Sequence, residues 1–406
     1  MMSALMNTRA LLLAIFILMA GSGFLSTLIA IRLEAAGVTA VTIGLVATSY
    51  FAGLTIGSIR VTRLLSEIGH IRSFAVFVSL YSATSLTYAI FENAAVWMVL
   101  RFVDGFVMAG VFICLESWLN RQATPVNRSS ILAAYMVALY SGQAAGQYLL
   151  NLSHMSPDLP FMVSAILLSI ALLPVLLTRM EQPTLEKVAP FSVRKLYAAS
   201  PLGIIGTLST GAMLGGFYAL GAVYIQRLGL GVSEVALFTS SVIAGGVALQ
   251  YPLGMLSDRF DRRSIIVACL FLIAAICAGF VMLDLTMGGL VVMAALFGGF
   301  SFALYPMCIA HSNDHLDEDQ RVGASSGLVL TYSVGAMIGP ILASSGMAAM
   351  GPAGLFIVIG VQALAGGLFG LWRMAWAPPV PAEEQQTFQS LPRTTPMAAV
   401  LEAQDD

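Results

Sequence analysis

Apolar segments long enough to cross a lipid bilayer recur along the whole chain. They lie at about residues 10–22, 41–59, 73–91, 95–115, 130–150, 160–178, 201–225, 234–256, 264–283, 287–310, 323–346 and 353–376. A membrane-spanning helix needs about 20 predominantly apolar residues. Barrel strands would be about ten residues long and would alternate in polarity, whereas these segments are longer and apolar on every side. The sequence therefore predicts an all-α membrane protein with twelve transmembrane helices.

Charged residues are scarce within these segments, and the whole chain shows the same deficit. Asp, Glu, Lys and Arg make up 10% of the 406 residues, whereas hydrophobic residues make up 58%. A soluble domain carries about a quarter charged residues, so lipid is the expected solvent. The four cysteines lie in apolar segments and lack the spacing of zinc ligands or of a disulfide framework. We therefore expect no metal and no cofactor.

The distribution of basic residues predicts the orientation of the helices. If the N-terminus is cytoplasmic, all but three of the 19 Lys and Arg residues lie in inner connections or at inner helix ends. The three others are Arg32 and Arg227, on the outer side, and Arg101, within a helix. Such a bias is the positive-inside rule. It predicts a multi-pass membrane protein with both termini in the cytoplasm.

A polar connection divides the chain into two halves of six helices each. We expect an N-terminal bundle at residues 1–178, a cytoplasmic loop at 179–200 and a C-terminal bundle at 201–376. The tail at 377–406 is rich in Pro, Glu, Gln and Thr, a composition typical of disordered segments. We therefore predict a disordered cytoplasmic tail.

The two halves share an internal repeat. Three segments of the first half match segments of the second half at an offset of 192–194 residues. The matched pairs are Gly105–Cys114 with Gly299–Cys308, Tyr140–Leu150 with Ser333–Ala343, and Thr62–Arg72 with Gly254–Ser264. A constant offset in three places indicates two parallel six-helix repeats. Transporters have this architecture, with the substrate bound between the repeats near the middle of the bilayer.

One inner connection is unusually charged. In G-M-L-S-D-R-F-D-R-R, Gly254–Arg263, five of ten residues are charged. It resembles the loop signature G-x-L-x-D-R-x-G-R-R of the major facilitator superfamily, with Asp261 in place of the second Gly. The sequence R-F-V-D-G at Arg101–Gly105 resembles the R-x-x-x-G signature of that family's fourth helix. The resemblance extends from about Thr8 to Ala377, is closest to a little-characterised branch of bacterial permeases, and implies a twelve-helix transporter of the inner membrane.

The charged connection is a candidate gate. Ion pairs between short loops and helix ends can hold one state closed and release another. We predict that Asp258, Arg259 and Arg262 form such pairs, with Asp258 also near the N-terminus of the helix that begins at about Gly323. The alternative is that the loop only anchors its helices at the inner surface. Anchoring requires basic residues but no aspartate.

The family resemblance indicates three further site residues. The segment E-S-W-L-N-R, which starts at Glu116, resembles an acidic segment that pairs with basic loop residues in the family, so we expect Glu116 to pair with Arg72 or Arg121. In the family the seventh and tenth membrane helices, here expected at residues 201–225 and 287–310, line the central cavity, which makes Tyr218 and Tyr305 candidates for solute contact. The alternative for both tyrosines is hydrogen bonding between helices.

Arg101 and Asp104 stand three residues apart in the fourth helix, and charged residues within membrane helices are functional candidates by default. They can neutralise each other. Alternatively, Asp104 takes up and releases a proton, while Arg101 stabilises its ionised form or binds an anionic solute. His311 and His315 are four residues apart, with Asp314 between them, a spacing that could suit a metal. Without a third convergent ligand, two such histidines are more often helix caps or solvated residues, so His311 is only a further candidate for a proton-sensitive group.

These features predict a secondary transporter of a small organic solute that works by alternating access and is coupled to protons. An alternative is proton-coupled efflux of drugs or metabolites, and an alternative of another class is a membrane sensor on a transporter scaffold. The chain has no G-x-x-x-x-G-K-[ST] loop for ATP and no nucleophile–base constellation, so we do not expect an enzyme. The expected partners are the solute, protons and the lipid bilayer, with no nucleic acid, and the expected state is a monomer.

Overall fold

The computed structural model describes residues 2–124, 127–178, 183, 192–376, 380–381, 385–386, 388–389 and 392–393. Regular structure in these residues is entirely helical. Most of the expected cytoplasmic loop at 179–200 lies outside the described residues, apart from the short helix α8 (Val193–Ala199).

The N-terminal half consists of long helices that run back and forth across the molecule. They are α1 (Met2–Ser22), α2 (Leu25–Ala35), α3 (Ala40–Ile68), α4 (His70–Ile90), α5 (Ala94–Gln122), α6 (Arg128–Gln147), the 3₁₀ helix η1 (Tyr148–His154) and α7 (Leu159–Leu176). α2 follows α1 after a two-residue interruption, and the two helices together make one span, Thr8–Ala35. η1 likewise prolongs α6.

The C-terminal half repeats this arrangement. Its long helices are α9 (Pro201–Arg227), α10 (Val232–Arg259), α11 (Arg262–Met282), α12 (Met287–Asn313), α13 (Glu318–Met350) and α14 (Gly354–Trp376). Among the described residues, eleven helical spans are long and apolar enough to cross a membrane. The twelfth long helix is α6, whose three serines and two glutamines lower its hydropathy. With it, the expected twelve-helix fold is confirmed.

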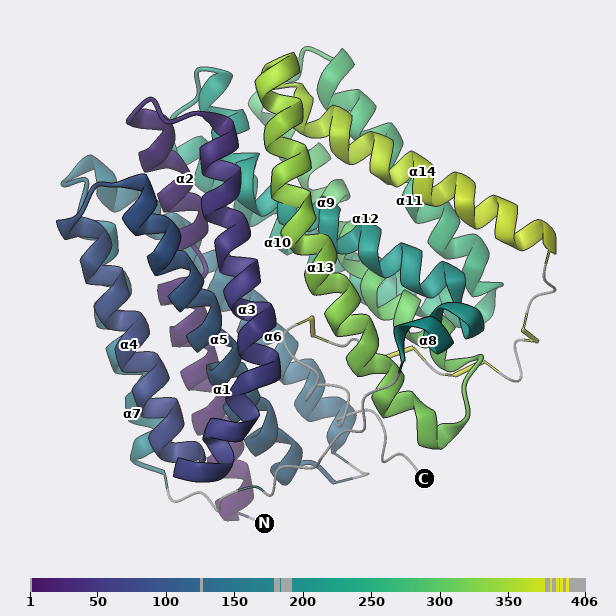
Figure 1. Ribbon diagram of the computed structural model, residues 1–406, viewed down its shortest axis with the longest axis horizontal. Coiled ribbons are helices and arrows are strands. Elements are labelled where there is room, and N and C mark those ends of the chain that lie inside the picture. Colours follow the sequence, from purple (N-terminus) through teal and green to yellow (C-terminus); the bar gives the residue numbers. More distant parts are fainter. Residues whose placement is uncertain are drawn as a thin grey trace.

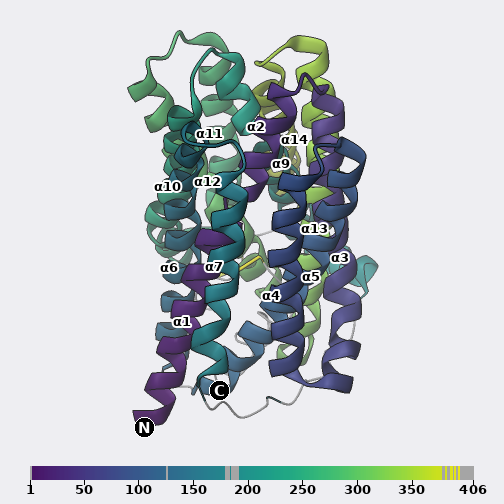
Figure 2. The same cartoon turned by 90° about the vertical axis from the view of Figure 1, so that its left-hand side faces the viewer.

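The two halves pack their helices in the same pattern. α3 lies against α5 as α10 lies against α12, α1 against α6 as α9 against α13, and α4 against α7 as α11 against α14. The halves meet where α3 packs against α13 and where α6 packs against α10. Because α3 corresponds to α10 and α6 to α13, each of these two contacts is the symmetry equivalent of the other. The molecule therefore has a pseudo-two-fold axis between two six-helix bundles, as the internal repeat predicts (Figures 1 and 2).

The glycines of the repeat explain how closely the helices approach. A Cβ added at Gly142 or Gly146 would overlap carbonyl oxygens of α1, and one added at Gly335 or Gly339 would overlap carbonyl oxygens of α9. Only glycine, which has no side chain, lets the two helix backbones approach so closely, and such pairs of small residues are typical of membrane helices. The matched segments of the two halves thus perform the same packing role.

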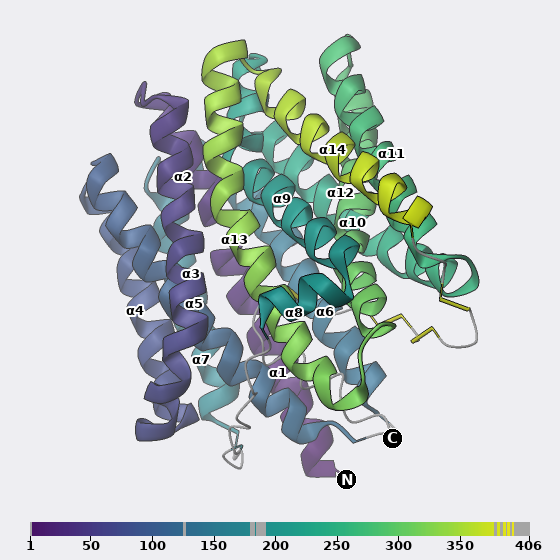
Figure 3. The same cartoon turned by 45° about the vertical axis from the view of Figure 1, so that its right-hand side comes forward.

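The two ends of the bundle differ. At one end lie α2 and the C-terminal end of α9, and we call it the α2 end. At the opposite end α1 begins and α8 lies beside the start of α13, and we call it the α8 end (Figures 1 and 3). The described conformation joins the two halves at the α2 end.

Candidate transport site

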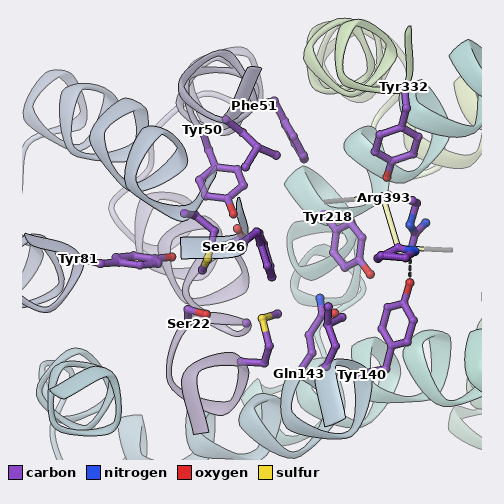
Figure 4. A pocket seen from close by; sticks show the side chains of 17 residues that line it. Ser22, Ser26, Tyr50, Phe51, Tyr81, Tyr140, Gln143, Tyr218, Tyr332 and Arg393 are labelled. Carbon is purple, nitrogen blue, oxygen red and sulfur yellow. Dashed lines mark hydrogen bonds between the residues drawn. The ribbon is translucent and has the colours of Figure 1, made fainter. Parts of the chain in front are cut away.

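A cavity of about 160 Å³ lies between the two halves. Its wall comes from α1, α2, α3, α4, α5, α6, α9, α13 and the C-terminal tail. The polar side chains of the wall are Ser22, Ser26, Tyr50, Tyr81, Tyr140, Gln143, Tyr218, Tyr332 and Arg393 (Figure 4). Five tyrosines among apolar side chains suit an organic solute that has both apolar surface and polar groups.

Arg101 and Asp104 form a buried ion pair on α5. Nη1 of Arg101 lies 3.6 Å from Oδ2 of Asp104, and the two residues expose 2% and 0% of their surface. The carboxylate also accepts hydrogen bonds from the hydroxyls of Thr84 at 2.5 Å and Tyr88 at 2.6 Å, both on α4. A buried charge is tolerated when it is both paired and hydrogen-bonded. Both oxygens of Asp104 therefore have partners.

The ion pair lies directly behind the cavity wall. Nη2 of Arg101 donates a hydrogen bond to Oγ of Ser26 at 2.5 Å, and its guanidinium carbon lies 4.2 Å from the ring centre of Tyr50. Both Ser26 and Tyr50 line the cavity. A solute that contacts either side chain would therefore be one residue away from the ion pair.

The two candidate tyrosines occupy different positions. Tyr218 on α9 lines the cavity and points into it (Figure 4). Tyr305 on α12 is fully buried, with its ring centre 5.3 Å from that of Tyr332. Because Tyr332 is itself a wall residue, Tyr305 lies in the layer behind the wall. The sequence analysis did not single out Tyr332, which α13 brings to the cavity.

The charged connection forms a cluster within the C-terminal half. Arg262, which is 1% exposed, lies 2.7 Å from Oδ1 of Asp258 and 2.7 Å from Oδ2 of Asp314. We call these three residues the Arg262 cluster. Burial raises the pKa of the Asp314 carboxyl, although the charge of Arg262 opposes this effect. The cluster joins α10, α11 and the end of α12, whereas Arg259 is exposed.

The remaining predicted residues lie near the α8 end. Glu116 is fully buried on α5 and accepts a hydrogen bond from the Tyr135 hydroxyl at 2.9 Å. Arg72 is exposed on α4, and the ion pair expected for Glu116 stays a prediction. The rings of His311 and His315 lie 4.8 Å apart, and Nδ1 of His315 is 2.9 Å from the carbonyl oxygen of His311. No group of three potential metal ligands occurs in the described part of the chain.

An ion pair at the α2 end was missing from the sequence-based candidates. Nε and Nη2 of Arg227 donate to the two carboxylate oxygens of Glu34 at 2.7 and 3.0 Å. Glu34 lies at the end of α2 and Arg227 ends α9, so the pair joins the two halves. The two residues are 193 positions apart, which equals the repeat offset. Residues at equivalent positions can meet near a pseudo-two-fold axis, and this signal could have revealed the pair.

Part of the C-terminal tail lies against the site. The backbone N–H of Phe388 donates to the Asp258 carboxylate at 3.0 Å, and the Arg393 guanidinium donates to the Tyr140 hydroxyl at 3.0 Å (Figure 4). We expected a disordered tail from its composition. Of its described residues, Gln386 and Phe388 contact the Arg262 cluster and Arg393 contacts the cavity, and no sequence pattern signalled these contacts. The disorder expected for the tail as a whole stays a prediction.

Known proteins with related sequences and structures support this description. The chain is 29% identical over 356 residues to an "uncharacterized MFS-type transporter YcaD" of Salmonella enteritidis PT4, with 86% of this chain and 91% of the relative covered. The relative of Salmonella newport is 28% identical over the same coverage. These relatives agree with the expectation of a little-characterised branch.

Solved structures with the same fold are known at low sequence identity. A point mutant of the nucleoside transporter NupG has a TM-score of 0.77 at 13% identity, covering 90% of this chain and 99% of that chain. A bacterial homologue of the human lysosomal transporter Spinster, in an inward-facing unoccupied conformation, has a TM-score of 0.73 at 16% identity, covering 93% and 99%. These similarities establish the fold alone.

The family is shown by a sequence model. The model of the Major Facilitator Superfamily matches residues 11–296 and 204–401. Those matches cover almost the whole chain, including both halves and the charged connection. The protein therefore belongs to the Major Facilitator Superfamily, a family of membrane transporters and not of enzymes.

Proposed function

We propose that the protein moves a small organic solute across the bacterial inner membrane by alternating access, and that Asp104 carries the coupling proton. The observation that supports this proposal most directly is the Arg101–Asp104 pair, buried behind the wall of a cavity between the two halves. Carboxylates within membrane helices mark proton relays and substrate sites. A cavity lined by both halves suits a solute that is passed across by rocking of the halves.

In this proposal the α8 end faces the cytoplasm and the α2 end faces outward. The bias of basic residues supports that orientation. The described conformation is then closed toward the outside, where Glu34 and Arg227 join the halves. Alternating access requires this pair to break whenever the cavity opens outward.

The contacts of the ion pair suggest how proton and solute are linked. Protonation would remove the charge of Asp104 and would leave Arg101 held by Ser26 and the ring face of Tyr50. Ser26 and Tyr50 are wall residues, so protonation changes the surface that the solute contacts. Two binding events that alter the same side chains are thermodynamically coupled, and each changes the affinity for the other.

Transport into proteoliposomes tests the proposal. Labelled nucleosides, sugars, amines and organic acids would be offered with and without an imposed pH gradient. We expect one class to accumulate only with the gradient. Asp104→Asn should abolish accumulation and spare exchange of solute, because exchange needs only the rocking of the halves. Glu67→Gln, which removes a carboxylate that is exposed at the surface, is the matched control and should transport normally.

Other results would change the assignment. If Asp104→Asn still accumulates solute, the proton site lies elsewhere, and Glu116 and His311 are the next candidates. Accumulation driven by the opposite gradient would make the protein an exporter of drugs or metabolites. If solutes bind and none is transported, the protein acts as a sensor.

A further inference from the structure

The described part of the C-terminal tail is bound to the Arg262 cluster. The N–H of Gln386 donates to Oδ1 of Asp314 at 2.7 Å, and its carbonyl accepts a hydrogen bond from Arg262 at 2.6 Å. The N–H of Phe388 donates to both carboxylate oxygens of Asp258 at 3.0 Å. Hydrogen bonds to charged groups are stronger than those between neutral groups, so they fix this segment without regular secondary structure. The tail is thus held across α10, α11 and the end of α12.

From this anchor the tail reaches the cavity between the halves, where Arg393 is seated among aromatic rings. Its guanidinium carbon lies 4.2 Å from the ring centre of Phe302, 5.7 Å from that of Tyr332 and 6.0 Å from that of Tyr140. Nη2 also donates to the Tyr140 hydroxyl at 3.0 Å. A cation within about 6 Å of a ring face is attracted by the ring quadrupole. We call Tyr140, Phe302 and Tyr332 the aromatic cage.

The charge of Arg393 is compensated differently from that of two other buried arginines. Arg101 and Arg262 each lie beside a carboxylate. Among the described residues, no ion pair involves Arg393, and its buried Nη1 has no hydrogen-bond acceptor. An arginine is always charged, and within the part of the chain that the structure describes the ring faces, not a carboxylate, compensate the charge of Arg393. The cage therefore stabilises a positive charge by itself.

The cage also spans the two halves. Tyr140 lies on α6, whereas Phe302 and Tyr332 lie on α12 and α13. The rings of Tyr140 and Phe302 are 5.3 Å apart, and Tyr140 and Tyr332 line the cavity. A group bound in the cage is therefore touched by both halves at once, which is the position expected for a transported solute.

Arg393 itself could instead be a ligand for an anionic solute. Its surroundings favour a cage that binds cations over an arginine that binds anions, because the rings surround the guanidinium and the Tyr140 hydroxyl accepts one of its hydrogen bonds. Arg393 also lies between Tyr140 of one half and Tyr332 of the other, so a group seated there separates side chains of the two halves (Figure 4). An occupant that must leave before transport proceeds behaves as a competitor of the solute.

We propose that the aromatic cage binds the cationic group of the transported solute, and that Arg393 occupies the cage as an intramolecular competitor. The inference rests on the proposed transport function. An organic cation and the seated tail exclude each other, so the tail inhibits transport until a cation displaces it or the anchor at the Arg262 cluster releases it.

Binding of methylguanidinium to the purified full-length protein tests the proposal by calorimetry. Methylurea, which is neutral and has nearly the same shape, is the control ligand. Arg393→Gln should bind methylguanidinium at least about tenfold more tightly than the parent protein, as follows if the tail fills the cage in nine molecules of ten. Neither protein should bind methylurea. Arg373→Gln is the matched control, because Arg373 lies over the ring of Trp372, an exposed side chain away from the cavity, and it should bind like the parent.

A second variant tests the cage. Phe302→Leu in the Arg393→Gln background should weaken methylguanidinium binding by about tenfold, because the nearest ring face is lost. The proposal is overturned if Arg393→Gln gains no affinity, if methylurea binds equally well, or if acetate binds the parent and not the Arg393→Gln variant. This last result would make Arg393 a ligand for anions. Since the assay measures binding alone, a protein that binds methylguanidinium as expected but accumulates no solute would contradict only the transport function.

Discussion

The ion pair between Glu34 and Arg227 offers the sharpest test of how the two halves are held together. It is bidentate, with distances of 2.7 and 3.0 Å, and its side chains are 20% and 27% exposed. An exposed ion pair contributes about 0–1 kcal/mol. Two charge-assisted hydrogen bonds and partial burial raise our estimate to about 1–2 kcal/mol after allowance for solvent screening. Removing one charge should therefore favour opening at the α2 end by about 5- to 30-fold.

Double electron–electron resonance can measure this shift. Spin labels on cysteines placed at Ala36 and Leu228 report the distance between the halves, because both residues are exposed and lie beside the pair. The four native cysteines are buried, so they should not interfere. In Glu34→Gln we expect a second, longer distance to become populated. The exchange of charges, Glu34→Arg with Arg227→Glu, should restore the single distance.

A control separates this effect from general loss of charge at the same end. Glu92 pairs with Arg32 within the N-terminal half, so Glu92→Gln should leave the distance distribution unchanged. If Glu34→Gln gives the same distribution as the parent protein, the ion pair does not hold the halves together. Packing between α2 and α9 would then have to account for the closure.

Three further predictions follow from the fold. Cysteine at Arg72 should be labelled from the cytoplasm and cysteine at Gly231 from outside in intact cells, and labelling of both from one side would contradict the orientation. Gly339→Ala should destabilise the protein by about 1–3 kcal/mol and lower its melting temperature, because the added Cβ would meet a carbonyl oxygen of α9. Gly288→Ala should leave the melting temperature unchanged, because the Cβ added there would lie at an ordinary contact distance of 3.9 Å from the Thr286 hydroxyl. The pKa of Asp261 is lowered, because its contacts with Arg263 outweigh the opposing effect of burial. Asp261→Asn should therefore have its full destabilising effect above about pH 4. As the pH falls below the folded pKa of Asp261, the difference in stability between the variant and the parent protein should vanish.

Much of the fold could be predicted because lipid imposes simple rules. Eleven of the expected spans are evident from hydropathy alone, and α6 is recognisable by its match to the α13 segment. Ion pairs between residues close in sequence could be predicted equally well. Arg101 and Asp104 are three residues apart, and Asp258 and Arg262 are four apart on consecutive helical segments, so local geometry brings each pair together.

The candidate site was less predictable because long-range contacts decide it. Tyr305 and Tyr332 are both aromatic residues of apolar helices, and only the packing of α12 against its neighbours shows which of them reaches the cavity. The seat of Arg393 depends on residues from α6, α12 and α13, none of which is near it in sequence. The composition of a segment indicates whether it can fold by itself in water. It gives no information about hydrogen-bond acceptors that other parts of the chain provide.

The position of Glu34 and Arg227 near the pseudo-two-fold axis has a consequence for the symmetry of the molecule. If the two halves were identical, equivalent positions would carry the same charge, and two carboxylates or two guanidiniums would face each other and repel. The attraction seen here is available because the two halves carry opposite charges at this pair of equivalent positions. The same difference makes the association of an N-terminal half with a C-terminal half more favourable than that of two like halves. The opposite charges of Glu34 and Arg227 thus favour pairing of the two unlike halves of one chain.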